Sequence, residues 1–375
     1  MDAQSGRPFQ GRQFCVIGAG VAGLALARRI ALSGGAVMVL EARKVGGGAS
    51  GASAGVLKPP RGGKSLISRL SLGAHSGYDR YARDLETETG IALEFRRCGY
   101  VDAATETAAE SELRKGLSSL LSHGISAQWL EADALRRLVP DISRNARGAL
   151  FLPGAAWIHP PALMESLRRS CLALGVDIQE GCAARIATAT DLQDAGRWHV
   201  EATGIGGRDL EGRETIVAAG AWTGTVLAPA GLAPAAPIQP IRGQMAEVGF
   251  SGAMGPIVHH RDVYVIPRPG GTAWVGSTVE DVGFDETVIP ERVLALVEGA
   301  REILPGLGAI RRSWAGLRPK LLRRGGPLIG EGEPPVLAGH YRSGIQWGPI
   351  TAHILAARIA GDPALVEPFA FSGPG

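Results

Sequence analysis

The hydrophobic pattern near the N-terminus describes a βαβ unit. An apolar run over residues 14–17 leads into a G-x-G-x-x-G segment at 18–23. An Ala- and Leu-rich stretch follows, and a second apolar run over 36–40 ends at Glu41. Short apolar runs on either side of a helical segment are typical of buried parallel strands joined by a crossover helix. We therefore predict strand, helix and strand in this order.

Further along the chain, helical and strand-like patterns follow one another. Helices are predicted over 74–89, 106–123, 131–138, 160–174, 290–304 and 349–359, three of them beginning at prolines, which the first helical turn favours. Strands are predicted over 148–152, 176–178, 183–188, 198–201, 215–222, 241–248, 263–267 and 273–277, with a Pro-rich linker over 228–240. The order βαβ, helices, meander, strands, helix predicts an α/β (α+β mixed) fold with two discontinuous domains.

The glycines of the first unit have the spacing of a dinucleotide site. Gly18 permits the tight turn, Gly20 lets the backbone approach a pyrophosphate, and Gly23 lets helix and strand pack closely. The pyrophosphate would lie at the helix N-terminus, where free N–H groups and the helix dipole favour negative charge. Glu41 is placed to accept hydrogen bonds from the adenosine ribose. This pattern predicts dinucleotide binding but does not distinguish NAD from FAD.

Composition narrows the class of protein. A chain of 375 residues with 45% hydrophobic and 20% charged residues is expected to form two globular domains. The net charge is only +3 and no basic run alternates with aromatics, so we expect no nucleic-acid partner. The four cysteines are scattered, which favours reduced thiols and no metal site. Residues 1–13 lack a signal-peptide pattern and no apolar run reaches membrane-spanning length, so we expect a cytoplasmic protein without a membrane span.

Three short motifs have alternative interpretations. Residues 51–55 match G-x-S-x-G, but three glycines precede them where a nucleophile elbow needs a hydrophobic strand. Residues 62–65 end like a P-loop, but Lys58 occupies the position of its first glycine. His259 and His260 are adjacent, so on a strand they point to opposite faces and cannot chelate one metal together. We expect neither a serine hydrolase, nor a P-loop, nor a metal centre.

Three other segments are better candidates for a site. The glycine-rich residues 45–56 leave room for a backbone to lie against a bulky ligand. Residues 312–319 place an arginine after a predicted small-residue turn, and 339–349 form a glycine-spaced loop that opens onto the C-terminal helix. Such a loop can direct helix N–H groups at an anionic ligand edge. From composition alone, the arginines of the last two segments are better explained as surface residues on ordinary turns.

At these residues the chain resembles the D-amino-acid oxidase-like flavoprotein family, most closely its glycine oxidase branch associated with thiamine biosynthesis. The similarity runs in order through residues 16–41, 49–56, 157–160, 217–222, 240–244, 264–268, 314–319 and 339–345. The resemblance implies a Rossmann-type FAD-binding domain over 1–90, 155–225 and 320–375, with a discontinuous mixed-sheet substrate domain over 91–154 and 226–319.

The resemblance also implies a non-covalent FAD and an amino-acid or amine substrate. Substrate contacts are expected at Tyr264, Arg318 and Arg342. Cofactor contacts are expected at Gly18, Gly20, Val21, Ala22, Gly23, Glu41, Ala42, Arg43, Ala49, Ser50, Ala54, Gly55, Val56, Ala184, Gly220, Gly316, His340, Tyr341, Arg342, Ser343, Gly344, Ile345 and Gln346. Related sarcosine oxidases tether their flavin to a C-terminal cysteine, and this chain has none after Cys182.

The implied reaction is oxidative deamination of glycine, a small D-amino acid or a secondary amine, with O2 reduced to H2O2. Arg318 presents a planar donor fork suited to a substrate carboxylate, and the chemistry needs no obligatory acid or base side chain because the cofactor performs it. Ser343 stands where the glycine oxidase pattern has Asn, and Gln346-Trp347 replace an aliphatic pair. The substrate is therefore less fixed than the reaction class.

Other activities stay open at this point. A dehydrogenase of the same family would pass electrons to a quinone or another acceptor. A tRNA-modifying flavoenzyme would act on a wobble uridine, although the few lysines and the lack of a basic stripe disfavour it. A flavin-binding module without catalysis is the remaining alternative. The oligomeric state, including a homo-oligomer, is undecided by the sequence.

Overall fold

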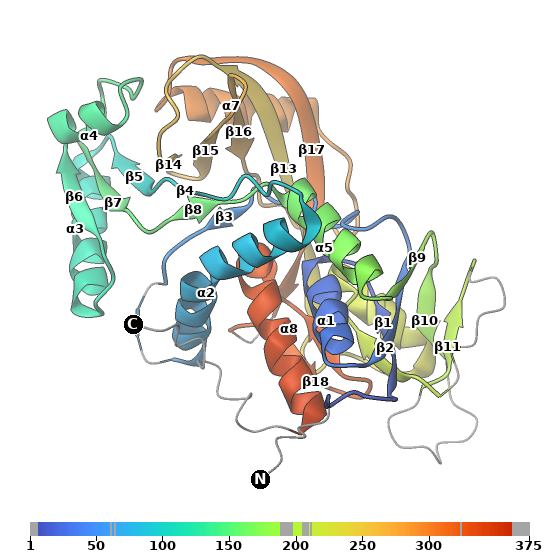
Figure 1. The fold of residues 1–375 in the computed structure, drawn as a ribbon. Coiled ribbons are helices and arrows are strands. Elements are labelled where there is room, and N and C mark those ends of the chain that lie inside the picture. Colours follow the sequence, from blue (N-terminus) through green and yellow to red (C-terminus); the bar gives the residue numbers. More distant parts are fainter. Residues whose placement is uncertain are drawn as a thin grey trace, which may run out of the picture.

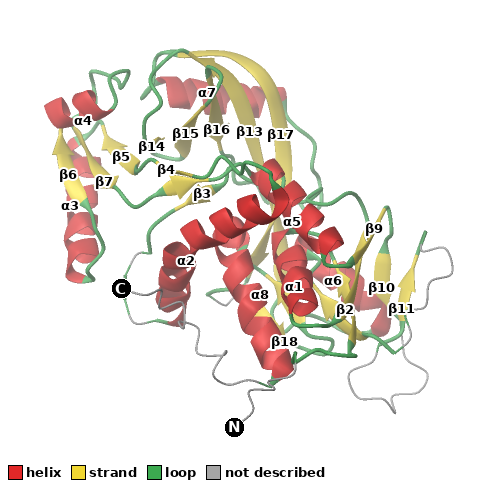
Figure 2. Cartoon of the chain, in the orientation of Figure 1, coloured by secondary structure: helices red, strands yellow, loops and turns green. Residues whose placement is uncertain are grey.

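Two sheets with separate hydrophobic cores form the molecule. The computed structural model describes residues 7–60, 62–63, 65–187, 198–204, 210, 212–322 and 325–361. Figure 1 shows one sheet with its helices in the lower half of the view and the other sheet in the upper half. Figure 2 shows that helices gather around the lower sheet and that long strands dominate the upper one.

The first sheet has six strands in the order β18-β19-β12-β1-β2-β9. The strands are β1 (Gln13–Ile17), β2 (Ala36–Glu41), β9 (Asp177–Glu180), β12 (Glu214–Val217), β18 (Leu328–Glu331) and β19 (Val336–Ala338), and all neighbours except β18 and β19 pair in parallel. The buried apolar runs recognised in the sequence are β1 and β2, which carry Val16 and Val39 into the core. The predicted βαβ unit is therefore confirmed.

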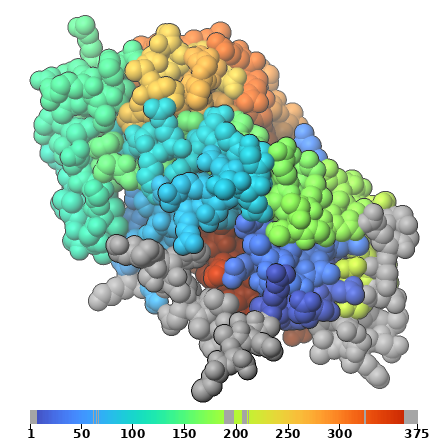
Figure 3. Space-filling view, viewed as in Figure 1, coloured from blue at the N-terminus to red at the C-terminus, as the bar shows by residue number. Residues whose placement is uncertain are grey.

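Four helices pack together beside this sheet. They are α1 (Val21–Leu32), α2 (Leu66–Thr89), α5 (Pro160–Ala173) and α8 (Gly344–Ala360), and α1 contacts both α5 and α8. The other face carries α6 (Thr223–Leu227) and the hairpin β10 (Ala184–Ile186) and β11 (Val200–Ala202). In the space-filling view, the cyan end of α2 lies on the surface between the blue residues of the first sheet and the orange residues of the second (Figure 3).

The second sheet has eight strands in the order β17-β13-β16-β15-β14-β5-β7-β6. The strands are β5 (Tyr100–Ala104), β6 (Gln128–Glu131), β7 (Gly148–Leu152), β13 (Ile238–Phe250), β14 (Ile257–His260), β15 (Val263–Arg268), β16 (Thr272–Gly276) and β17 (Leu307–Leu321). Helix α7 (Pro290–Arg301) covers one face, while α3 (Thr107–Ser122) and α4 (Ala132–Leu138) lie at the β6 end. The short strands β3 (Val56–Leu57), β4 (Arg96–Arg97) and β8 (Ala156–Trp157) form a third sheet.

A long antiparallel ribbon of β13 and β17 connects the two halves. Its register runs from Phe250 opposite Leu307 to Ile238 opposite Leu321. Leu307 belongs to the core beneath α7, whereas Leu321 packs into the core on the α6 side of the first sheet. The ribbon therefore enters both cores.

The predicted mixed α/β class is confirmed, and the predicted domain limits stay a prediction. Several element boundaries were wrong. Helix α2 begins at Leu66 instead of 74, because the Ser65 side chain caps it by accepting a hydrogen bond from the Ser68 N–H at 3.1 Å. The predicted turn within 312–319 is part of strand β17.

The C-terminal helix also begins earlier than predicted. It starts at Gly344 and holds Pro349 inside, so the proline does not mark its first residue. The predicted linker is shorter than expected because β13 begins at Ile238. Helix α6 and strands β3, β4, β5, β6, β8, β14, β18 and β19 were not predicted. The predicted strand over 183–188 is seen as β10, and Thr188 lies outside the described residues.

Candidate active site

A cavity of about 1770 Å³ lies where the two sheets meet. Residues from the ends of β1 and β2, the start of α1, the segment 47–60, strands β15 and β17 and the loop before α8 line it. Segments separated by up to about 300 positions in sequence therefore meet in one space. All predicted site residues line this cavity except Gly23 and Gly55.

The glycine motif forms a backbone cradle at one end of the cavity. Gly18 has a φ of 112°, and a Cβ there would stand 2.5 Å from the Ala218 carbonyl oxygen. A Cβ on Gly23 would stand 2.0 Å from the Gly18 oxygen, which explains why Gly23 supports the turn from behind without lining the cavity. Gly55 is similarly confined, with a φ of 73° and a Cβ position 2.0 Å from the Ile158 oxygen. These positions admit glycine only.

Polar contacts hold the same end in shape. Glu41 accepts hydrogen bonds from the Ala19 N–H at 2.8 Å and the Arg43 N–H at 2.9 Å. The Val21 N–H at the start of α1 donates to Ser50 Oγ at 3.0 Å. The carboxylate and the helix N-terminus thus face the cavity together, as a ribose and a pyrophosphate require. These residues fit the adenosine half of FAD.

Arg43 and Trp222, which line this end of the cavity, take part in aromatic and ionic contacts that no sequence motif indicates. The Arg43 guanidinium lies 4.7 Å from the Trp222 ring centroid and forms an ion pair with Glu286 at 2.5 Å. Trp222 also contacts Phe284, with ring centroids 5.8 Å apart. Because Glu286 and Phe284 belong to the segment between β16 and α7, only the tertiary fold brings them to Arg43.

Arg318, Tyr264 and Arg342 line the opposite end of the cavity. Arg318 donates from Nη1 to the Thr278 carbonyl oxygen at 3.0 Å and from Nη2 to Ser277 Oγ at 2.7 Å. Burial lowers the pKa of Arg318, Tyr264 opposes this shift, and nearby Arg342 adds to it. Burial raises the pKa of Tyr264, so its hydroxyl stays protonated and can donate a hydrogen bond.

Two glycines make room for these side chains on the sheet. A Cβ on Gly243 would overlap the Arg318 guanidinium, at 1.8 Å from Nη2, and a Cβ on Gly276 would stand 2.5 Å from Tyr264 Cζ. Gly316, which pairs with Gly243, would place a Cβ 2.6 Å from Ala52 Cβ. The sheet surface is therefore smooth where the segment 49–56 and the two site residues lie on it.

The loop before α8 borders the site from the first sheet. His340 is buried and its Nε2 lies 2.8 Å from Thr351 Oγ1, and burial lowers its pKa to about 4, so the imidazole is neutral. Gln346, in the first turn of α8, donates from Nε2 to the Lys58 carbonyl oxygen at 2.9 Å. The predicted loop 340–346 thus meets the glycine-rich segment at the cavity.

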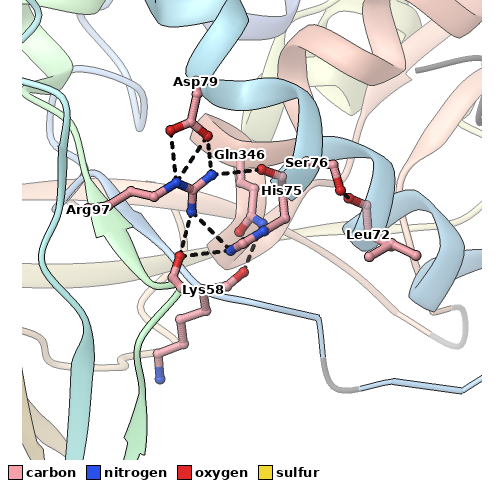
Figure 4. A network of polar contacts seen from close by, with 8 residues as sticks. Lys58, Leu72, His75, Ser76, Asp79, Arg97 and Gln346 are labelled. Carbon is pink, nitrogen blue, oxygen red and sulfur yellow. Dashed lines mark hydrogen bonds and ion pairs between the residues drawn. The ribbon is translucent and has the colours of Figure 1, made fainter. Parts of the chain in front are cut away.

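A polar network lies beside the contact between Gln346 and Lys58 (Figure 4). Arg97 donates from Nε to Asp79 Oδ1 at 2.8 Å and from Nη1 to the Gly154 oxygen at 2.5 Å. His75 on α2 lies 2.9 Å from the same oxygen through Nε2. The network joins α2 to the loops beside Lys58.

Sequence reasoning missed several cavity residues. Ser277 and Thr278 orient Arg318 only because β13 lies between β16 and β17, so that the Arg318 side chain reaches across Gly243 to the end of β16, and no motif marks them. His259 lines the cavity with Asp102, its Nδ1 2.8 Å from Asp102 Oδ1, while His260 faces the Ala103 carbonyl oxygen. The expected opposite orientation of the two histidines is confirmed.

The described residues contain no group of His, Cys, Asp or Glu side chains able to hold a metal ion. All four cysteines are described, and each is a free thiol. Among the described helices, none is both long and apolar enough to cross a bilayer.

Comparison with known proteins identifies the class. The family of FAD dependent oxidoreductases, abbreviated DAO, matches residues 13–358, so the chain belongs to this family. The predicted family, the FAD cofactor and the class of FAD-dependent oxidoreductase are thereby confirmed.

Individual relatives place the chain more closely. It is 31% identical to the glycine oxidase of Pseudomonas aeruginosa over 96% of this chain and 98% of that protein. It is 29% identical to the bifunctional protein ThiO/ThiG of a Nostoc species over 94% of this chain and 54% of that longer protein. The crystal structure of glycine oxidase from Geobacillus kaustophilus superposes with a TM-score of 0.84 at 25% identity, covering 93% and 95% of the two chains.

Proposed function

We propose that this protein oxidises the C–N bond of a small amino acid or amine, with glycine, a small D-amino acid or a secondary amine as substrate. The observation that carries the proposal is the position of Arg318 in the same cavity as the nucleotide cradle. Bound FAD would supply hydride acceptance, and O2 would then be reduced to H2O2. The names of the relatives support this reaction class.

Arg318 is prepared to bind a carboxylate. Its guanidinium has five N–H donors, and Thr278 and Ser277 take two of them, so the rest remain for a ligand in a fixed plane. The guanidinium of Arg342 interacts with that of Arg318 in this part of the cavity, and the two positive charges favour an anion there. The neutral Tyr264 hydroxyl adds a donor without adding charge.

The chain's own groups around the reacting carbon are donors of hydrogen bonds. Arg318 and Tyr264 would orient the substrate, and an oriented substrate can save several kcal/mol of the barrier, roughly 7–11 kcal/mol at most. The N-terminus of α8 at Gly344 would place positive potential at the cavity, where it would favour negative charge on a bound flavin. We further infer that residues 1–90, 155–225 and 320–375 form the FAD-binding domain, with 91–154 and 226–319 contributing the substrate side.

Anaerobic mixing of the FAD-loaded protein with glycine, sarcosine, D-alanine and D-proline tests the proposal. We expect at least one of them to bleach the yellow absorbance of the oxidised flavin, because hydride transfer reduces the cofactor. No bleaching by any of the four would refute the proposal. Admitting air then decides the acceptor. Rapid reoxidation with stoichiometric peroxide indicates an oxidase, whereas reduced flavin that persists in air and is reoxidised when a quinone or another acceptor is added indicates a dehydrogenase.

A further inference from the structure

The outer part of the cavity lies beyond Tyr264, over strands β14 and β5. Lys58, Tyr100, Asp102 and His259 line it, and we call these four residues the distal pocket. Lys58 follows β3, Tyr100 and Asp102 belong to β5, and His259 belongs to β14. None of them has a role in the proposed binding of FAD or of the α-carboxylate.

The strand register shows how far the distal pocket extends. Tyr264 pairs with His259, and His259 pairs with Asp102, so these three residues form one row across β15, β14 and β5. Neighbouring strands lie about 4.8 Å apart, which places the backbone of Asp102 roughly 10 Å from that of Tyr264. Tyr100, two residues earlier on β5, shares the face of Asp102. A ligand that reaches from Arg318 to the distal pocket is therefore longer than glycine.

Tyr100 is the platform of the distal pocket. The Lys58 ammonium lies 3.7 Å from the centroid of the Tyr100 ring, a distance typical of cation–π contacts. The His259 ring stacks on Tyr100 with centroids 5.7 Å apart and an interplanar angle of 29°. Asp102 accepts or shares the Nδ1 proton of His259 at 2.8 Å, so its carboxylate is engaged and the imidazole is oriented.

The main chain of Lys58 is anchored separately from its side chain. The Gln346 amide donates to the Lys58 carbonyl oxygen, beside the network of His75 and Arg97. Figure 4 shows the Lys58 side chain running away from this network. Because Gln346 belongs to the first turn of α8, this hydrogen bond attaches the main chain of Lys58 to α8, while the side chain extends to the Tyr100 ring.

Cationic groups outnumber anionic ones among the described residues that line the cavity beyond its nucleotide end. The cationic residues are Lys58, Arg261, Arg292, Arg318 and Arg342, against the acidic Asp102 and Asp262. Arg261 at the rim is paired with Glu106 and Glu302. With Asp102 engaged by His259, the local field between Arg318 and Lys58 favours negative charge.

We propose that the preferred substrate carries a second carboxylate, and that Lys58 binds it against the Tyr100 and His259 wall. This inference rests on the proposed function. Arg318 binds the carboxylate next to the reacting carbon and Lys58 binds the one at the end of the arm. The enzyme then selects N-substituted glycines or amino acids with an acidic arm over uncharged molecules of equal length.

The test compares two substrates of matched shape on the FAD-loaded full-length protein. N-(2-carboxyethyl)glycine carries the acidic arm, and N-(3-methylbutyl)glycine replaces its carboxylate with an isopropyl group. We expect kcat/KM to favour the acidic substrate by about tenfold or more, the effect of one charge-assisted hydrogen bond. Equal kcat/KM values in the wild-type enzyme would overturn the inference.

Variants locate the source of the preference. Lys58→Met keeps the length of the side chain and removes its charge, so the ratio of the two kcat/KM values should fall towards one, and Lys58→Arg should retain it. Lys115→Met is the control, because Lys115 is an exposed lysine of α3 outside the cavity lining, and it should leave the wild-type ratio intact. A wild-type ratio in Lys58→Met would also contradict the inference.

A binding measurement separates this inference from the proposed function. Calorimetric titration with glutarate and with 5-methylhexanoate, its uncharged-arm match, needs no turnover, and Lys58→Met should lose the advantage of glutarate. If no amine reduces the flavin, the proposed function fails while this titration still decides on the distal pocket. If glycine reduces the flavin but neither comparison shows a preference for the second carboxylate, only this inference fails.

Discussion

At the scale of single residues, Arg318 depends on its neighbours more than on its own strand. Ser277 and Thr278 fix its guanidinium plane, and Gly243 opposite leaves the space in which that plane lies. A planar fork held in this way loses little further freedom when it binds a carboxylate. The proposed chemistry requires a guanidinium that is held in one plane. Residues on β13 and β17 and at the end of β16 together hold Arg318 in this way.

Replacement of Arg318 with alanine should strongly weaken substrate capture. By analogy with truncation of a buried charge pair, the variant should lose roughly 2–5 kcal/mol of transition-state stabilisation. This loss corresponds to a fall in kcat/KM for glycine of about 30- to 4,000-fold. The measurement is the anaerobic rate of flavin reduction as a function of substrate concentration, with the FAD content of the variant determined in parallel.

Arg311→Ala is the matched control, because Arg311 is exposed on the same strand and lines no part of the cavity. It should retain the wild-type kcat/KM. An unchanged kcat/KM in Arg318→Ala would remove Arg318 from the site.

At the scale of elements, the segment after β16 is held to β13 by a buried ionic network. Glu280 accepts hydrogen bonds from Thr278, from Gln244 at 2.8 Å and from Arg242 at 2.8 Å, and Arg242 also pairs with Asp285. Burial alone would raise the pKa of Glu280, but these hydrogen bonds and the Arg242 charge outweigh it and lower the pKa from 4.5 to about 2. The network thereby supports Ser277 and Thr278 behind Arg318.

This pKa gives the folded protein a stability term that disappears in acid. A carboxyl whose pKa is lower in the folded state stabilises the fold above its unfolded value, near 4.5, and the term is lost as pH falls towards 2. Glu280→Gln should therefore lower the free energy of unfolding by about 2 kcal/mol at neutral pH, with a difference that shrinks below pH ~4. Urea unfolding of both proteins at pH 7 and at pH 3.5 measures it.

The exposed Glu298, which pairs with Arg301 on α7, provides the comparison. Glu298→Gln should change the unfolding free energy by less than about 1 kcal/mol. A Glu280→Gln difference that is independent of pH would show that its carboxylate has an ordinary pKa in the folded protein.

The contact between α1 and α8 depends on a glycine. A Cβ on Gly348 would stand 3.0 Å from Val21 Cγ1, so the two helices can approach this closely only without a side chain there. Gly348→Leu should lower the free energy of unfolding by about 1–3 kcal/mol through overpacking, and should weaken FAD binding because Val21 lines the cavity. Chemical denaturation and flavin titration of the variant check both effects.

Gly224→Ala is the companion substitution, since α6 leaves open space around that position. It should be neutral or slightly stabilising, by up to about 1 kcal/mol, because alanine favours the helix. Equal stability of Gly348→Leu and wild type would mean that α8 can move away from α1 without cost.

Local patterns were enough for some elements and insufficient for others. The β1-α1-β2 unit was predictable because its apolar runs, glycines and acid lie within 30 consecutive residues. Part of strand β17 was mistaken for a turn because small residues precede Arg318, while the pairing of this strand with β13 is a long-range property. Helix α8 was started too late because Pro349 fits a first turn as well as the interior position it occupies.

The glycine motif alone predicted the nucleotide end of the candidate site, whereas the roles of Tyr264, Arg318 and Arg342 were predicted only through the family resemblance. No local signal connects Lys58 with Gln346, or Arg43 with Glu286, because these contacts join residues far apart in sequence. Ser277 lies on no motif, and its side chain matters only once β16 and β17 stand on either side of β13. Such residues require the three-dimensional fold.

At the scale of the whole molecule, we predict that FAD is held without a covalent bond. Of the four described cysteines, Cys182 lines the cavity, and it lies beside Glu41 at the nucleotide end, away from the substrate residues. Acid precipitation should therefore release all of the yellow flavin into the supernatant. Flavin absorbance retained in the washed pellet would contradict this.

Loading with FAD should also stabilise the fold. At free FAD of 100 times its dissociation constant, the folded state gains about 2.7 kcal/mol, and the midpoint of thermal unfolding rises with FAD concentration. Gly18→Ala should abolish this rise, because its Cβ would collide with the Ala218 carbonyl group in the cradle. A concentration-dependent shift in that variant would place the nucleotide elsewhere.

The β13–β17 ribbon has a mechanical consequence. The fifteen residues of β17 span about 50 Å. Because both ends of the β13–β17 ribbon are embedded in hydrophobic cores, the ribbon connects the two halves rigidly. Bending the ribbon would disrupt strand pairing and core packing together, so we expect no large hinge motion between the two halves. Entry and exit of reactants should therefore require movements smaller than a rotation of one sheet against the other.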